Sequence, residues 1–405
     1  MELLRREFIK AAGMSTLAFA AAPQLAFGNG ARNTDTLVTI FLRGGLDGLA
    51  AVAPYTENEY YSRRPTLAVP RPGMTNGAID LDGRYGLHPA LNPLKRHWDA
   101  GSLGIVHAVG LSTPSRSHFD AQDFMERAWM QQGGIGTGWM NRHLQTGVRA
   151  GDPTFRAVAI GRAVPRSNAG PAPVVALTSP TSYQLSTSTM RGPQLSAALQ
   201  QAFVGPSTLD SAGGRVFGAI SELAANPAVS AAPENGASYP NTTFGTYLRT
   251  LAALVKAGIG VEAASADIGG WDSHRNQAAD LNRLLDELAR ALDAFVTDLG
   301  PRMSNVSVVT MTEFGRKAFE NASQGTDHGR GSVMFALGGG VIGKQVMTDW
   351  PTLREDALDG GDLRVTIDYR AVLAEWLTRR GGATSVEAIF PSFGGRATSG
   401  LFRTR

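Results

Sequence analysis

Three pairs of an acidic residue and a histidine stand out because the members of each pair lie at most two positions apart and beside a predicted strand. The pairs are His118 with Asp120, Asp272 with His274, and Asp327 with His328. A fourth pair, His97 with Asp99, lies in a predicted helical stretch and is interpreted as surface. Carboxylates and imidazoles without thiolates suit zinc, manganese or magnesium, and the chain of 405 residues contains no cysteine. A single pair is more often a hydrogen-bonded loop than a ligand set. Three pairs among seven histidines favour a divalent metal site.

The pairs lie beside segments whose composition predicts buried strands. These short apolar runs, rich in β-branched residues, are residues 37–42, 104–109, 259–266, 306–311 and 333–337. Asp47 and Glu313 also follow strands of this series. Ligands of open α/β sheets bind at the carboxyl ends of the strands. We therefore expect all eight side chains at one edge of one sheet.

Helical periodicity separates these predicted strands. Helices are expected at about 118–130, 277–299 and 369–378. Strands that alternate with helices predict an α/β fold of three layers, α/β/α, around a mostly parallel sheet. From residue 162 to 192 charge nearly vanishes and Pro, Ser, Thr and Ala dominate. We interpret about 162–258 as an inserted surface region.

The loop before the helix at His118 offers hydroxyl groups that could attack an ester. Its serines are Ser112, Ser115 and Ser117. A serine at a helix start has free backbone amides beside it for an anionic oxygen, and a neighbouring metal would activate its hydroxyl. An ordinary helix N-cap is an equally good interpretation.

The first ten residues contain Arg5 and Arg6, followed by Phe-Ile, a lysine and a weakly apolar, alanine-rich stretch. This is the pattern of a twin-arginine signal peptide, and small residues place its cleavage near Gly28. We expect a signal over 1–28, the twin-arginine export machinery as a partner, and a periplasmic or otherwise extracytoplasmic location. Because that route carries folded proteins, a metal could bind before export.

Composition narrows the expected partners. The formal net charge is only +3, and no basic stripe is interleaved with aromatic residues, so nucleic acid is not an expected partner. The apolar stretch of the signal is too short and too rich in alanine for a stable membrane span, and no later segment is apolar for long enough. We therefore expect no stable span after signal removal.

Five motifs in order along the chain resemble the uncharacterised bacterial family called domain of unknown function 1501. The motifs are Arg43–Leu49, Ser117–Asp120, Gly270–His274, Thr312–Arg316 and Gly325–Gly329. That family is placed in the alkaline-phosphatase-like superfamily with sulfatases and cofactor-independent phosphoglycerate mutases. The resemblance implies one alkaline-phosphatase-like domain over residues 29–405.

The resemblance also implies metal ligands. Asp47, Asp327 and His328 match the residues of one superfamily metal site, and Asp272 with His274 is similar to part of a second. The superfamily's last histidine has no counterpart, because no histidine follows His328. The protein is thus expected to hold one ion, or two if a residue from the remaining candidates substitutes. These candidates are His118, Asp120 and Glu313.

Residues 112–116 resemble the Ser/Cys-x-Pro-Ser-Arg element of sulfatases, which adds Arg116 to the three serines as a catalytic candidate. The resemblance implies a metal-dependent hydrolase of small anionic esters, phosphate or sulfate, that acts through serine attack. The alternative is an exported relative that has kept the fold without catalysis and acts in binding or envelope assembly.

Overall fold

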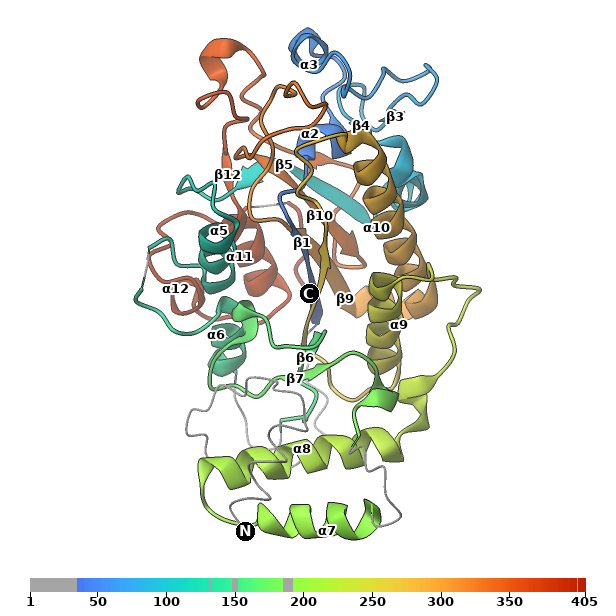
Figure 1. Ribbon diagram of the computed structural model, residues 1–405, viewed down its shortest axis with the longest axis vertical. Coiled ribbons are helices and arrows are strands. Elements are labelled where there is room, and N and C mark those ends of the chain that lie inside the picture. Colours follow the sequence, from blue (N-terminus) through green and yellow to red (C-terminus); the bar gives the residue numbers. More distant parts are fainter. Residues whose placement is uncertain (1–34, 132, 148–151, 185–191, 399) are drawn as a thin grey trace.

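The computed structural model describes residues 35–131, 133–147, 152–184, 192–398 and 400–405. The predicted signal peptide, residues 1–28, lies outside the described residues. A central sheet of nine strands runs through the molecule in the order β11-β5-β10-β9-β1-β8-β6-β7, with β12 beside β5 (Figure 1). Its strands are β1 (Thr36–Arg43), β5 (Leu103–Gly110), β6 (Ala157–Ile160), β7 (Val175–Leu177), β8 (Ala263–Gly269), β9 (Val306–Met311), β10 (Ser332–Gly338), β11 (Val346–Met347) and β12 (Ile367–Asp368).

All neighbouring strands of this sheet pair in parallel except β10, which is antiparallel to both β5 and β9. The predicted mostly parallel α/β sheet is therefore confirmed. The reversed direction of β10 matters for the site, because it brings the residues before β10 to the edge where β1, β5, β8 and β9 end. A small antiparallel sheet contains β2 (Val52–Ala53), β3 (Ile79–Asp80) and β4 (Gly86–Leu87).

Helices cover both faces of the central sheet and form the outer two of three layers. In Figure 1, α9 (Thr243–Lys256) and α10 (Gln277–Leu299) lie on one side. The other side carries α5 (His118–Arg127), α6 (Trp139–Thr146), α11 (Tyr369–Arg379) and α12 (Val386–Ile389). The remaining helices are α2 (Gly48–Ala51), α3 (Asn58–Arg63), α4 (Lys95–Asp99), α7 (Gly192–Ala202) and α8 (Thr208–Ala225). Short 3-10 helices cover Pro89–Leu94, Arg166–Asn168, Pro180–Ser182, Pro227–Ser230, Gly300–Asn305 and Glu355–Ala357.

Strand β1 shows how the sequence builds the two apolar cores. Side chains alternate across a strand, so Val38 and Ile40 pack with α9 and α10, whereas Leu37 and Phe41 pack with α5, α6 and α11. A strand that is buried on both faces is rich in apolar residues, as β1 is between Leu37 and Leu42. Helix α10 buries one face through apolar residues three or four positions apart, which is why its predicted bounds agree with the structure.

The predicted insertion, about 162–258, is too wide. Its residues 175–177 form β7, which pairs in parallel with β6 at the edge of the main sheet, and its residues 243–256 form α9 in the helical layer. Within this range, α7 and α8 project from one end of the molecule (Figure 1). No helix among the described residues is both long and apolar enough to span a membrane.

A buried histidine makes the folded state sensitive to acid. The His107 side chain in β5 is fully buried, with Nε2 3.0 Å from the Val52 carbonyl oxygen and Nδ1 accepting the Ala108 N–H at 2.7 Å. Burial lowers the pKa of His107 to about 4, although the Val52 carbonyl and the charge of Asp47 act in the opposite direction. The folded protein therefore keeps this imidazole neutral at pH 5, where the unfolded chain protonates it.

We expect this histidine to destabilise the protein as the pH falls from the unfolded pKa of His, near 6.5, toward 4. Stability is fully present above that range, and the loss from His107 is about 3 kcal/mol by pH 4. Urea unfolding at pH 7 and pH 4.5 measures it, with His107→Gln as the variant that lacks the titrating group. Equal pH dependence in the wild type and the variant would contradict the assignment.

Candidate metal centre

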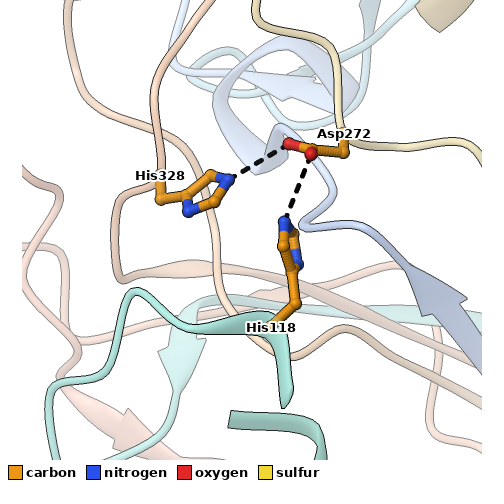
Figure 2. Close-up of side chains that lie close together, drawn as sticks. All are labelled: His118, Asp272 and His328. Atoms are coloured by element: carbon orange, nitrogen blue, oxygen red, sulfur yellow. Dashed lines mark hydrogen bonds and ion pairs between the residues drawn. The ribbon is translucent and has the colours of Figure 1, made fainter. Parts of the chain in front are cut away.

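Four of the predicted residues meet at the carboxyl edge of the sheet. Asp272 and His274 lie in the loop after β8, His118 is the first residue of α5, and His328 precedes β10. Figure 2 shows the two imidazoles of His118 and His328 turned toward the carboxylate of Asp272. Ligand atoms of these three residues all lie within 4.8 Å of one another. Elements distant in sequence thus supply one compact group of donors.

The donor atoms of this group are spaced like the ligands of a single metal ion. The Nε2 atoms of His274 and His328 are 3.0 Å apart, and they lie 3.0 and 3.1 Å from Oδ1 of Asp272. Nε2 of His118 lies 3.4 Å from Oδ2 of Asp272. A tetrahedral ion with ligands at about 2.0–2.1 Å places ligand atoms about 3.3 Å apart, so this spacing fits a bound divalent ion.

Each of the three rings has its other nitrogen held by an oxygen that can only accept. Nδ1 of His118 lies 2.8 Å from Oε1 of Glu313, and Nδ1 of His274 lies 2.9 Å from Oδ1 of Asp327. Nδ1 of His328 lies 2.8 Å from the carbonyl oxygen of Arg116. These acceptors favour the tautomer with the ring proton on Nδ1, in which each Nε2 has a lone pair for a metal.

This arrangement of donors makes the centre a candidate cation site. In this tautomer the lone pairs of His274 and His328 face each other and the Asp272 carboxylate at 3.0–3.1 Å, a spacing that a bound cation would stabilise. Nε2 of His118 is buried and has no hydrogen-bond partner. Histidine ligands of metals typically donate their other N–H to a carboxylate or carbonyl, as all three rings do here. The nitrogen-rich set favours zinc over magnesium.

The side chain of Arg316 connects the loops of this centre through hydrogen bonds. Its guanidinium is buried and donates to the carbonyl oxygens of Gly44, Gly45, Trp271 and Thr326. It also donates to Oδ1 of Asp272 at 2.8 Å. Partial burial raises the pKa of Asp272, but the hydrogen bond and charge of Arg316, with His328 and His274, lower it overall to about 2. Asp272 is therefore an anion at neutral pH.

Glycines allow the loops to pack backbone against backbone. Gly44 has φ +122°, and a Cβ there would lie 2.6 Å from the backbone nitrogen of Asp272. A Cβ on Gly325 would lie 2.2 Å from the carbonyl carbon of His274. Neither contact is tolerable, so the ligand positions require glycine at both sites.

The structure does not bring Asp47 to the centre, contrary to the predicted grouping with Asp327 and His328. Its carboxylate is buried and accepts from Nη1 of Arg64 and from the side-chain amide of Gln277, each at 2.6 Å, and from the N–H of Ala50 at the start of α2. The buried guanidinium of Arg64 neutralises the charge that a metal would otherwise balance. Asp47 therefore connects α2 and α10 to Arg64, which in turn donates to the carbonyl oxygens of Lys317 and Ala318.

Three further predicted ligands also take other places. Glu313 and Asp327 accept hydrogen bonds from Nδ1 of His118 and of His274, respectively. The hydrogen bond from His274 is the main cause that lowers the pKa of Asp327. Asp120 lies in the first turn of α5 and is not in the group of described residues whose ligand atoms converge. The spacing of the Asp-His pairs identified the region but did not separate ligands from their supports.

Each predicted catalytic side chain near the centre has a local contact. The Ser117 hydroxyl accepts the Asp120 N–H as the N-cap of α5, and the Ser115 hydroxyl accepts the Ser117 N–H. Nη2 of Arg370 lies 3.4 Å from the Ser112 hydroxyl. The guanidinium of Arg116 forms an ion pair with Asp362 at 2.8 Å. The backbone carbonyl of Arg116 accepts a hydrogen bond from Nδ1 of His328.

Sequence reasoning missed the roles of Arg316 and Gln122. Arg316 ends the motif Thr312–Arg316, but an arginine at a strand end gives no sign that it will be buried. Gln122 lies one turn after His118 and donates to Oε1 of Glu313 at 2.8 Å, which helps to hold the acceptor of His118 in place. The spacing of four residues on a predicted helix is the signal that could have found it.

Comparison with known proteins identifies the family. Residues 102–374, two thirds of the 405-residue chain, match the family model described as "Protein of unknown function (DUF1501)". The chain belongs to this family. The predicted family resemblance is thus confirmed. A comparison with curated proteins finds no match.

Among solved structures, this DUF1501 protein is similar to the C-terminal periplasmic domain of EcEptC from Escherichia coli, determined as a complex with Zn. The TM-score is 0.35 and the sequence identity is 10%, with 78% of this chain and 77% of that chain covered.

We expect the DUF1501 protein to bind zinc, and Asp272→Asn or His328→Ala to weaken binding more than about 100-fold, because even residues that only support ligands commonly cost 10–100-fold. Competition with a chromogenic chelator measures the affinity. Asp120→Asn is the matched control and should bind like the wild type. Wild-type affinity in Asp272→Asn would contradict the site.

Replacing Arg316 by lysine should loosen the centre without removing a ligand. A single ammonium cannot satisfy four carbonyls and a carboxylate, so zinc affinity should fall about 10–100-fold, with a lower melting temperature. Arg275→Lys, at an exposed position beside His274, is the control. The account is wrong if both variants bind zinc equally well.

Proposed function

We propose that this protein is an exported hydrolase of phosphate or sulfate esters that depends on a divalent ion, with zinc as the preferred metal. The observation that carries the proposal is the convergence of three imidazole Nε2 atoms on the Asp272 carboxylate. His118, Asp272 and His328 would hold the ion, with His274 at its border. When bound, the ion supplies Lewis-acid chemistry to the ester oxygens and activates a nucleophile.

The surrounding residues keep the donors ready for the ion. Arg316 keeps Asp272 ionised, and the oxygens of Glu313, Asp327 and Arg116 fix the orientation of the rings and make them more basic. This preorganisation supports an anion-binding centre that does not need to rearrange when the ester arrives.

Ser117 is the serine that we propose as the nucleophile. It lies between Arg116, whose carbonyl accepts from His328, and His118, which faces Asp272. Its hydroxyl oxygen accepts one helix N–H, which leaves the hydroxyl proton free to be donated. Ser112 and Ser115 are further from His118 in the sequence, and their variants serve as comparisons for Ser117.

The twin-arginine motif around Arg5 and Arg6 supports export of the folded protein, and an ion bound in the cytoplasm would cross with it. A second candidate function is a non-catalytic protein of the envelope. One observation favours it: the contacts of the serine hydroxyls in the described structure are with backbone groups and Arg370, not with a residue of the metal centre.

Substitution of Ser117 tests the serine mechanism. Ser117→Ala removes both the nucleophile and the N-cap, which costs about 1 kcal/mol of stability, whereas Ser117→Asn keeps a capping group. We expect both variants to hydrolyse 4-nitrophenyl phosphate and sulfate at least about 1,000-fold more slowly than the wild type, with unchanged zinc content.

Two outcomes would count against the proposal. Wild-type activity in Ser117→Asn would exclude this serine as the nucleophile, and Ser112→Ala and Ser115→Ala show whether another serine serves. A zinc-loaded wild type that hydrolyses neither ester would favour the non-catalytic alternative.

A further inference from the structure

A cleft of about 600 Å³ opens beside the metal centre, between the ends of β6 and β8 and the first halves of α9 and α10. This volume is in the range of sites for small organic ligands. Arg43 and Gly269 line the cleft and are register partners at the ends of β1 and β8. Gly269 lies three residues before Asp272, so the cleft and the centre share one loop.

The walls of the cleft contain both apolar rings and charged groups, so a ligand must fit both kinds of surface. Phe244 and Tyr247 of α9 contribute aromatic rings, and Leu284 of α10 adds an aliphatic surface. Asp267 and Glu287 contribute carboxylates. An apolar chain would cover these polar groups without forming hydrogen bonds to them. A ring with hydroxyl groups satisfies both surfaces.

Arginines complete this polar lining. Arg162 follows β6, is exposed, and has no carboxylate partner within the described parts of the chain. Arg43 is held by Asp267 at 2.7 Å and by Glu126 at 3.1 Å. Carboxylates that accept hydroxyl protons, guanidinium groups that donate to hydroxyl oxygens, and aromatic faces that pack against C–H groups are together suited to a sugar ring.

A line of hydrogen bonds connects the cleft to the metal ligands. Arg43 Nη1 donates to the Gln122 side-chain oxygen at 3.0 Å, and the Gln122 amide donates to Glu313 at 2.8 Å. The same Glu313 oxygen accepts from Nδ1 of His118 at 2.8 Å. A ligand in the cleft therefore lies against Arg43, which is connected to His118 through Gln122 and Glu313.

We propose that this cleft binds the saccharide part of a phosphorylated or sulfated sugar, whose anionic group reaches the metal centre. The inference rests on the proposed function for the ester group, but the cleft by itself should bind the sugar. The substrate class is then a sugar ester, and residues of α9 and α10 determine specificity.

Saturation-transfer NMR on the full zinc-loaded protein tests the cleft without reference to activity. The probes are glucose, galactose and N-acetylglucosamine, each free and as the 6-sulfate and 6-phosphate. At least one free sugar should bind, and Tyr247→Ala and Glu287→Gln should each weaken its binding about tenfold or more. Glu222→Gln, on the distant helix α8, is the matched control and should have no effect.

The variant Asp272→Asn separates this inference from the proposed function. It should weaken binding of the sulfated or phosphorylated sugar while the free sugar binds as in the wild type. Sugar binding that is the same in Tyr247→Ala, Glu287→Gln and wild type, or no sugar binding at all, overturns the inference, even if nitrophenyl esters are hydrolysed. Binding that depends on Tyr247 in a protein without hydrolase activity supports the cleft and contradicts the proposed function.

Discussion

The buried guanidinium of Arg316 is the interaction on which the carboxyl edge of this sheet depends. Three loops meet there without regular secondary structure, and their carbonyl oxygens would be unsatisfied if they were buried against one another. Arg316 donates to carbonyls of Gly44, Gly45, Trp271 and Thr326, and its positive charge offsets that of Asp272. Because a planar guanidinium has five donors in a fixed geometry, one side chain sets the relative position of all three loops.

At the same edge, Asp47 and Asp272 have different roles, and their exposure and neighbours explain the difference. Asp47 and Arg64 form a fully buried pair at 2.6 Å, with Gln277 as the second partner of Asp47 and Thr326 as the partner of Gln277. Asp272 is more exposed and faces imidazole nitrogens that carry lone pairs. The Asp47 carboxylate is enclosed by its partners, whereas Asp272, although Arg316 also donates to it, keeps Oδ2 toward Nε2 of His118 and is open to a cation.

The sequence was sufficient for much of the fold because long apolar runs and the periodic helix at 277–299 depend on local pattern. It failed for β6, β7, β11 and β12, which have two to four residues and depend on pairing with a neighbouring strand. Within the site, spacing brought His118, Asp272, His274 and His328 to one edge. It could not show that Asp327 and Glu313 accept hydrogen bonds from imidazole rings, or that Arg64 forms an ion pair with Asp47. Those roles depend on side-chain contacts between segments that are distant in sequence.

The central claim is that lone pairs on the Nε2 atoms of His118 and His328, with the Asp272 carboxylate, form a site for one divalent ion. Anomalous diffraction at the zinc edge from crystals of the purified, zinc-loaded protein tests it most directly. The account predicts an anomalous peak about 2.0–2.2 Å from these ligand atoms. A peak beside Asp47 instead, or no peak near the three residues, would contradict it.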